Sequence, residues 1–257
     1  MTRQGTWTDR EGRAVTVPEP PAAGSYYGPI GDFQGTAYER NAFARGTAQE
    51  VEFLVTALDL VPGTRVLDVG CGTARHARAL AERGLEPVGV DVSHGLLAAG
   101  HALGGPVRLA QADARALPLH DASADAVLCL CQGGFGITPG GDEAVLAEIA
   151  RVLRPGGRLA LTAFSAWFAA RFAAPEDAID VARGLVYTRA EVRGRDEARA
   201  EYDLWTTCYT PGHLQGLLDR TGLELEEVSG VEPGQYRHHA PTITDPELLL
   251  LARKRRG

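Results

Sequence analysis

Apolar and polar positions along residues 46–165 fall into alternating stretches of two kinds. Five short runs have the length and the valine- and leucine-rich composition of strands buried on both faces, at residues 66–69, 86–91, 107–113, 125–131 and 159–164. Between and before them, apolar residues recur at helical spacing, as at Val51, Leu54, Val55 and Leu58. This alternation of strands and helices predicts an α/β domain with a largely parallel sheet.

The pattern changes after residue 164. Residues 185–192 and 200–205 alternate with the period of strands on either side of a polar turn, which predicts a β-hairpin. A hairpin inserted after the fifth strand would emerge at the ligand-binding edge of the sheet. We therefore expect the insertion 165–209 to cap an acceptor site, although a dimer contact or a solvated hairpin would give the same pattern.

The two ends of the chain complete this division. Thr210 and Pro211 form a typical helix start, and the run 247–252 is a last buried strand. Residues 1–45 contain aromatic residues and glycines with no clear period. We expect a domain at 46–257 preceded by an N-terminal segment at 1–45.

Residues 65–78 (RVLDVGCGTARHAR) join a predicted strand to a helix through a glycine turn. Gly70 and Gly72 lack a Cβ, so the backbone can turn sharply and a ligand can approach it closely, beside the helix N-terminus. The second strand ends in Asp91, where a carboxylate can accept hydrogen bonds from ribose hydroxyls. A dinucleotide motif needs a third glycine where this chain has Arg75, whose bulk makes NAD or FAD the less favoured ligand.

The turn resembles the first motif of the class I S-adenosylmethionine-dependent methyltransferases, an acid followed by x-Gly-x-Gly-x-Gly. Asp68 is the acid, and Ala74 replaces the third glycine, a change that we expect the loop to tolerate if φ stays negative there. The string LRPGGRL at 153–159 matches the family's turn before its fifth strand. The resemblance implies a Rossmann-like, seven-stranded, mostly parallel sheet with helices on both faces, an N-terminal lid and the hairpin after strand five.

The resemblance also implies S-adenosyl-L-methionine as cofactor. Asp68 and the glycine turn would hold its methionine part, Asp91 the ribose, and Asp113 with Ala114 the adenine. The full implied cofactor-binding set is Tyr27, Asp68, Gly70, Cys71, Gly72, Thr73, Asp91, Val92, Asp113, Ala114, Cys131 and Gln132. Methyl transfer to O or N of a small-molecule acceptor is the expected reaction.

Candidate acceptor-site residues come from three loops. Phe135 lies among glycines after the fourth strand, Trp167 follows the fifth, and Tyr236 precedes the last. Each could instead pack in the core. His238 and His239 are candidate catalytic bases, because their loop should lie on the cofactor side and histidine accepts protons near neutral pH. Adjacent histidines on a polar surface loop are the alternative.

Charge, composition and the length of apolar segments indicate which partners, locations and metals to expect. The formal net charge of −7 over 257 residues argues against a nucleic-acid partner. No apolar segment is long enough for a membrane span and the N-terminus lacks a signal peptide, so we expect a cytoplasmic protein, as monomer or homodimer. The four cysteines lack metal-ligand spacing, and no metal is expected. The high alanine, arginine and glycine content hints at specialised bacterial metabolism. A nicotinamide-dependent oxidoreductase and a cofactor-binding protein without turnover are the alternatives.

Overall fold

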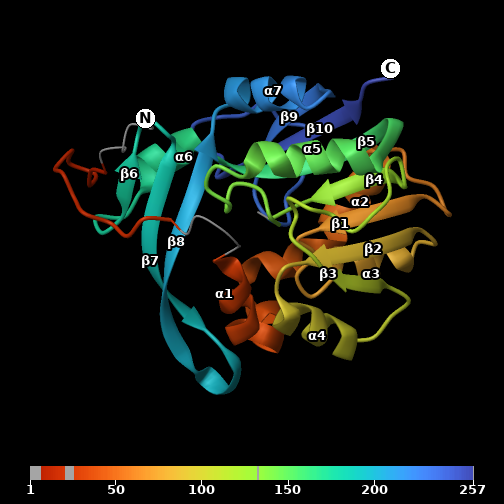
Figure 1. Cartoon of the computed structure of the whole chain (residues 1–257), viewed down its shortest axis with the longest axis horizontal. Helices are drawn as coiled ribbons and strands as arrows, with labels where there is room; N and C mark the ends of the chain where they lie inside the picture. Colours follow the sequence, from red (N-terminus) through yellow and green to blue (C-terminus); the bar gives the residue numbers. More distant parts are fainter. Residues whose placement is uncertain (1–6, 21–25, 132, 257) are drawn as a thin grey trace.

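A central sheet of mostly parallel strands organises the molecule (Figure 1). The computed structural model describes residues 7–20, 26–131 and 133–256. Within these ranges the central strands lie in the order β3-β2-β1-β4-β5-β10-β9. Their bounds are β1 Arg65–Val69, β2 Glu86–Asp91, β3 Arg108–Gln111, β4 Ala124–Cys129, β5 Leu153–Ser165, β9 Leu223–Val231 and β10 Glu247–Lys254. β10 is antiparallel to both neighbours and the other pairings are parallel, which confirms the predicted Rossmann-like sheet.

Helices cover both faces of this sheet because its strands are apolar on both sides. Leu248 and Leu250 of β10 pack in one core with helices α5 (Asp142–Val152) and α7 (Pro211–Arg220). Leu249 of the same strand packs in a second core with α2 (Thr47–Ala57) and α3 (Arg75–Ala81). Helix α4 (His94–Ala102) begins at Ser93, whose hydroxyl accepts from the Leu96 amide as a cap.

The predicted hairpin is present. Strands β7 (Leu185–Arg193) and β8 (Arg199–Tyr209) pair antiparallel through the 3₁₀ turn η3 (Arg195–Glu197), with the short strand β6 (Ala178–Asp180) along the edge of β7. The end of β8 pairs with the end of β5, so the hairpin leaves the sheet at the carboxyl end of the parallel strands, after helix α6 (Ala166–Phe172). Figure 1 shows it projecting beside α1.

The N-terminal segment folds into short helices between the hairpin and α4. They are α1 (Tyr27–Gln34) and the 3₁₀ helices η1 (Gly35–Arg40) and η2 (Ala42–Gly46). On one side, Asp32 accepts hydrogen bonds from the Ser93 hydroxyl and the Gly95 amide of α4. On the other, the Arg40 guanidinium lies 2.6 Å from the Glu197 carboxylate. The segment therefore bridges two parts of the fold that do not adjoin in sequence.

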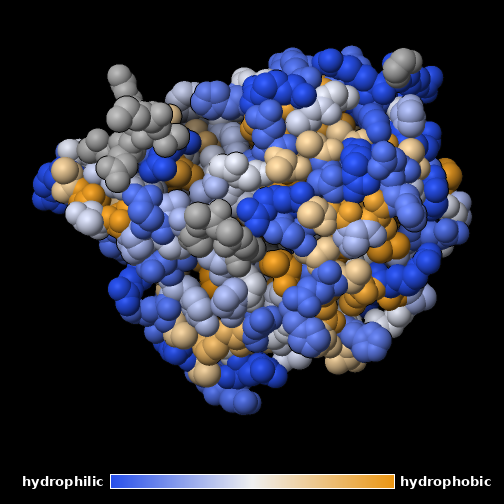
Figure 2. Space-filling model, in the orientation of Figure 1, coloured by the Kyte–Doolittle hydropathy of each residue, from blue (hydrophilic) through white to orange (hydrophobic). Residues whose placement is uncertain are grey.

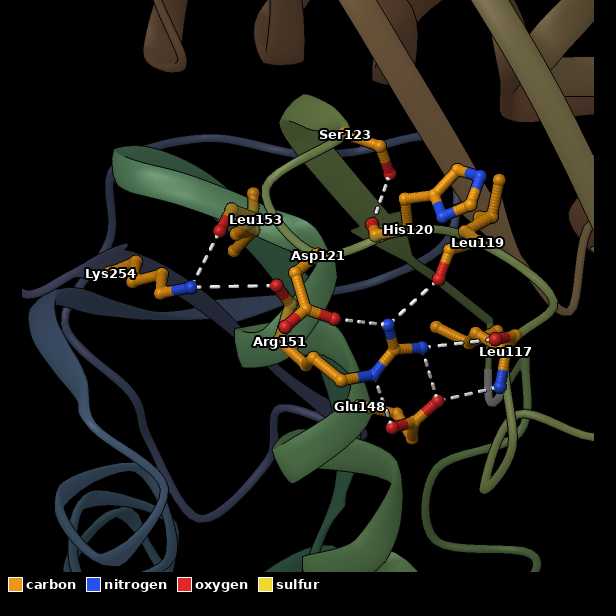
Figure 3. Close-up of polar contacts among 9 residues, drawn as sticks. All are labelled: Leu117, Leu119, His120, Asp121, Ser123, Glu148, Arg151, Leu153 and Lys254. Carbon is orange, nitrogen blue, oxygen red and sulfur yellow. Dashed lines mark hydrogen bonds and ion pairs between the residues drawn. The ribbon is translucent and has the colours of Figure 1, made fainter.

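Far from the ligand-binding edge, one arginine fastens the connection between β3 and β4 to helix α5 (Figure 3). The Arg151 guanidinium donates to the carbonyl groups of Leu117 and Leu119 and to the carboxylates of Asp121 and Glu148. Glu148 in turn accepts from the Leu117 amide at 2.7 Å.

Outside such networks, hydrophilic residues dominate the face in Figure 2. In the described part of the chain, no helix is both long and apolar enough to cross a membrane.

Two sequence-based expectations about the backbone need correction. The third and fourth strands end at Gln111 and Cys129, earlier than predicted, because the chain diverges there around a cavity. We expected the turn to tolerate Ala74 if φ stayed negative there, but the φ of Ala74 is +61°. The turn retains the left-handed geometry of a glycine even though alanine occupies the position.

Candidate cofactor and acceptor site

A cavity of about 350 Å³ opens at the carboxyl ends of the parallel strands. Open α/β sheets bind ligands at this edge, where the loops after neighbouring strands diverge. The central sheet contributes much of the wall, and the N-terminal helices and the hairpin contribute the rest. The lining residues are Tyr26, Tyr27, Tyr38, Gly70, Val90, Asp91, Val92, Leu96, Ala112, Ala114, Cys131, Gly133, Gly134, Ile137, Phe164, Leu204, Thr206, Pro233 and Glu247.

Two backbone amides anchor the Asp91 carboxylate in this wall. Its Oδ2 accepts from the Gly72 amide and its Oδ1 from the Ser93 amide, both at 2.8 Å. Burial raises the pKa of Asp91, and these amides oppose the rise. Each carboxylate oxygen still has acceptor capacity, since an ionised carboxylate offers about four lone-pair sites. A fixed bidentate acceptor beside an apolar cavity fits the two hydroxyls of a ribose.

The glycine turn brings two backbone segments into contact. Gly70 has φ +65°, and a Cβ placed on it would lie 2.0 Å from the Gly133 carbonyl oxygen. A Cβ on Gly72 would lie 3.3 Å from the Tyr38 ring. The missing side chains therefore leave room for the loop after β4 and for Tyr38 as well as for a ligand. The sequence predicted the close approach at this turn but not these protein partners.

Asp68 lies behind the turn and does not line the cavity. It is 2% exposed, and its Oδ2 has no hydrogen-bond partner among the described residues. Burial raises the pKa of Asp68 to about 7. An orphaned buried acceptor costs free energy until a donor reaches it. Its position next to Gly70 fits a ligand group that donates hydrogen bonds, such as the ammonium of an amino acid.

Glu50, Arg75 and His76 form a buried ionic cluster next to the glycine turn, and the sequence did not predict it. Glu50 Oε2 accepts from Arg75 Nη1 at 2.8 Å and lies 2.7 Å from His76 Nε2. Burial alone raises the pKa of Glu50, but the bonds from His76 and Arg75 outweigh it and bring the pKa to about 2. Arg75 also donates to Cys131 Sγ at 3.0 Å. Its side chain thus points into the interior and does not crowd the ligand space, contrary to expectation.

Only one residue of the predicted adenine-binding pair lines the cavity. Ala114 lines it, together with Ala112. Asp113 does not, because its carboxylate turns to Arg115 and accepts from its guanidinium at 2.6 Å and from its amide at 2.8 Å. Ionic pairing to Arg115 also lowers the pKa of Asp113. In this structure the Asp113 carboxylate is not available to an adenine.

The other predicted cofactor residues divide into two groups. Tyr27, Val92 and Cys131 line the cavity. Cys71 and Thr73 do not: the Cys71 thiol is buried against Gly89, and the Thr73 hydroxyl donates to Glu39 of η1. Gln132 lies outside the described residues.

None of the three predicted acceptor-site aromatics lines the cavity, although the third, Tyr236, is buried close to residues that do. Phe135 is fully buried and stacks on Tyr209 with ring centroids 5.2 Å apart, so it belongs to the core. Trp167 on α6 is half exposed and does not line the cavity. Tyr236 is buried outside the lining, with its backbone paired to Gln49. These aromatics pack or reach solvent because tertiary contacts, not loop composition, set their direction.

The structure also contradicts the placement of the two histidines at the reaction centre. His238 is an exposed side chain whose Nδ1 lies 2.8 Å from Glu227 of β9. His239 donates its amide to Ser229 and accepts at its carbonyl from the Gly230 amide. The loop does start on the cofactor side, where Pro233 lines the cavity. It then runs back along β9 and carries both imidazoles away from the site.

Sequence reasoning missed several cavity residues. Leu204 and Thr206 of β8 lie two positions apart and so share one face, a spacing that the hairpin's alternation already contained. Tyr38 comes from a 3₁₀ helix without periodicity. Glu247, at the start of β10, is an acid at a strand end, the same signal that identified Asp91.

Comparison with known proteins finds a family match for the central part of the chain. Residues 66–157 match the model of a methyltransferase domain. A demethylmenaquinone methyltransferase of Renibacterium salmoninarum is 39% identical over 113 residues, 44% of this chain and 46% of the relative. The chain therefore spans about half the length of the curated relatives it matches.

Solved structures extend the likeness to the whole fold. The CcbJ methyltransferase of Streptomyces caelestis superposes with a TM-score of 0.73 at 18% identity, covering 88% of this chain and 98% of that one. The [4+2]-cyclase SpnF gives 0.61 at 20% identity, covering 93% and 98%. These likenesses concern the fold alone. The motif and the family match identify residues 66–157 as a methyltransferase domain, and the sheet order is the one that the resemblance to the class I S-adenosylmethionine-dependent methyltransferases implies.

Proposed function

We propose that this protein transfers the methyl group of S-adenosylmethionine to an oxygen or nitrogen atom of a small molecule. The observation that supports this most directly is Asp91, held by the amides of Gly72 and Ser93 at the wall of an apolar cavity. A carboxylate fixed in this way suits a ribose.

The lining residues suggest which part of the cavity S-adenosylmethionine would occupy and which part the acceptor would occupy. Val92, Leu96, Ala114 and Ile137 give an apolar slot near Asp91 for an adenine ring. The methionine part would extend along Gly70 toward the buried Asp68 carboxylate. Phe164, Leu204 and Thr206 lie on the other side of the cavity and would face the acceptor.

The protein's contribution would be positioning and the exclusion of water. When bound, S-adenosylmethionine supplies a methyl group already activated by the sulfonium charge. Asp91 fixes the ribose and the apolar slot fixes the ring, which together orient the donor toward the acceptor. The tyrosines of the N-terminal helices and the hairpin would keep water from the reacting atoms.

Residues 1–45 would serve as a lid and the insertion 165–209 as an acceptor-site cap. Tyr26, Tyr27 and Tyr38 contribute the lid side of the cavity wall, and Leu204 and Thr206 the cap side. The relatives' name points to demethylmenaquinone as their substrate, but the relatives match less than half of this chain, and the family match ends at residue 157, before the cap. The identity of the methyl acceptor therefore cannot be taken from these relatives. We propose a cytoplasmic monomer or homodimer that acts in specialised metabolism.

One alternative has specific support. The fold is shared by SpnF, a protein named as a [4+2]-cyclase, so this architecture also occurs in a protein named for a reaction other than methyl transfer. A nicotinamide-dependent oxidoreductase has less support, because the turn belongs to a different motif.

Calorimetric titration separates these possibilities. We expect S-adenosylhomocysteine to bind the purified protein and NAD not to bind. Labelled S-adenosylmethionine offered with a panel of phenols, alcohols and amines should then yield a labelled product. Binding of NAD instead of S-adenosylhomocysteine would refute the proposal, and cofactor binding with no product across the panel would favour the non-transferring alternative.

A further inference from the structure

Glu247 is a second acid in the cavity wall, remote from the ribose site. It opens β10 and stands in register with Phe164 of β5 and Val231 of β9. The residue is 5% exposed and lines the cavity. Among the described lining residues, Glu247 and Asp91 are the two with carboxylates.

The sheet order separates these two carboxylates. Asp91 ends β2 and Glu247 begins β10, with β1, β4 and β5 between them. At about 4.8 Å per strand, four steps put their backbones about 19 Å apart. Asp91 is assigned to the ribose, so Glu247 belongs to the part of the cavity beyond the nucleoside.

The neighbours of Glu247 define the character of this part. Phe164 and Pro233 are apolar, and Leu204 and Thr206 of β8 face the same cavity. Burial raises the pKa of Cys131 to about 12, Arg75 opposes that rise, and the negative charge of Glu247 adds to it. The carboxylate therefore lies close enough to act on Cys131, which follows β4 and also lines the cavity.

We propose that Glu247 faces the methyl-transfer position and accepts the N–H or O–H of the acceptor atom, so that the acceptor is an amine or hydroxyl compound with an apolar body. This inference rests on the proposed function. The acceptor's lone pair forms the bond to the methyl carbon, and the bond from that carbon to sulfur breaks with its electron pair left on sulfur. The acceptor's proton passes to a carboxylate oxygen of Glu247, which thereby becomes neutral.

A cofactor analogue tests this without knowledge of the acceptor. Sinefungin carries an amino group on carbon where S-adenosylmethionine has its methylated sulfur, so it places an ammonium at the transfer position. We expect the wild type to bind sinefungin at least about tenfold more tightly than S-adenosylhomocysteine, as for a charge-assisted hydrogen bond. In Glu247→Gln this preference should fall to about twofold or less, with affinity for S-adenosylhomocysteine unchanged. Glu247→Asp, which keeps the charge on a shorter side chain, should retain part of the preference.

Glu224→Gln is the matched control, because it removes an exposed carboxylate from the neighbouring strand β9, away from the cavity. It should leave both affinities as in the wild type. An equal preference in the wild type and in Glu247→Gln, or none in the wild type, would overturn the role of Glu247. Should the wild type bind neither compound, the proposed function itself fails, and this inference fails with it.

Discussion

The Tyr26 hydroxyl both donates to the Trp205 carbonyl oxygen at 2.5 Å and accepts from the Trp205 amide at 3.2 Å. Their rings also meet edge to face, with centroids 5.3 Å apart. One side chain thus joins the N-terminal helices to strand β8 across 179 positions of sequence. Because both segments line the cavity, this contact holds two parts of its wall together.

Loss of that contact should loosen the N-terminal segment that we propose as a lid. We expect Tyr26→Phe to speed the release of S-adenosylhomocysteine by roughly 5- to 30-fold, the equivalent of one or two hydrogen bonds of about 1 kcal/mol each. Stopped-flow dissociation measures this rate. Tyr202→Phe is the control, since it removes a hydroxyl from the same strand and keeps the ring contact with Phe33. Equal release rates in the wild type and Tyr26→Phe would mean that the lid does not limit product release.

Removal of the Asp91 carboxylate should weaken cofactor binding. Asp91→Ala strands the amides of Gly72 and Ser93 and loses the proposed ribose acceptor, so we expect S-adenosylhomocysteine affinity to fall by about 1–3 kcal/mol. Calorimetry measures the change. Asp219→Asn, at an exposed ion pair with Arg255, should have no effect. Unchanged affinity in Asp91→Ala would place the ribose elsewhere.

The steric role of Gly70 can be separated from its backbone angle. Gly63 also has a positive φ, +85°, but a Cβ there meets nothing within 4 Å. Gly63→Ala should therefore cost only about 1–2 kcal/mol of unfolding free energy for the left-handed conformation. Gly70→Ala adds a clash with the Gly133 backbone, so a larger loss and a collapse of cofactor affinity should follow in denaturation and binding assays. Equal costs for the two variants would show that the loop at Gly133 yields freely.

The buried Asp68 should make the stability of the ligand-free protein depend on pH. Burial raises its pKa from 3.8 to about 7, so the folded state binds the proton more tightly than the unfolded state. Between these values, Asp68 should reduce the free energy of unfolding as pH rises, by at most about 1.4 kcal/mol per pH unit. Urea denaturation of the wild type and Asp68→Asn across this range measures the difference. Parallel curves for the two proteins would show that Asp68 does not titrate in this way.

Arg151 should matter for stability and not for ligand binding. Its guanidinium satisfies the carbonyl groups of Leu117 and Leu119, so we expect Arg151→Ala to lower the free energy of unfolding by about 1–3 kcal/mol. Affinity for S-adenosylhomocysteine should stay as in the wild type. Arg220→Ala, which removes an exposed pair with Glu143, should cost less than about 1 kcal/mol. If Arg151→Ala is as stable as Arg220→Ala, the network in Figure 3 contributes little.

Elements of regular period were predictable because local patterns determine them. The run 86–91 is strand β2 with the predicted bounds, and the alternating residues around 194–197 form the hairpin. Asp91 was identifiable at the same level, since a strand end in a strand–turn–helix unit has a fixed place beside the ligand.

Contacts between distant segments were not predictable from the sequence alone. Asp91 ends strand β2 and Asp113 lies just after strand β3, yet Arg115, two residues further on, pairs with the Asp113 carboxylate. His238 lies on the predicted loop, but pairing with Glu227 on β9 directs it outward.

The sequence by itself determined the order of strands and helices, the glycine turn and the carboxylate beyond it, because each depends on periodicity or on a few neighbouring residues. Only the tertiary structure decided which side chains reach the cavity. Glu247 lines it because antiparallel pairing brings the start of β10 beside the end of β5, 83 positions earlier at Phe164. Such pairings join residues through space, and no local pattern in the chain specifies them.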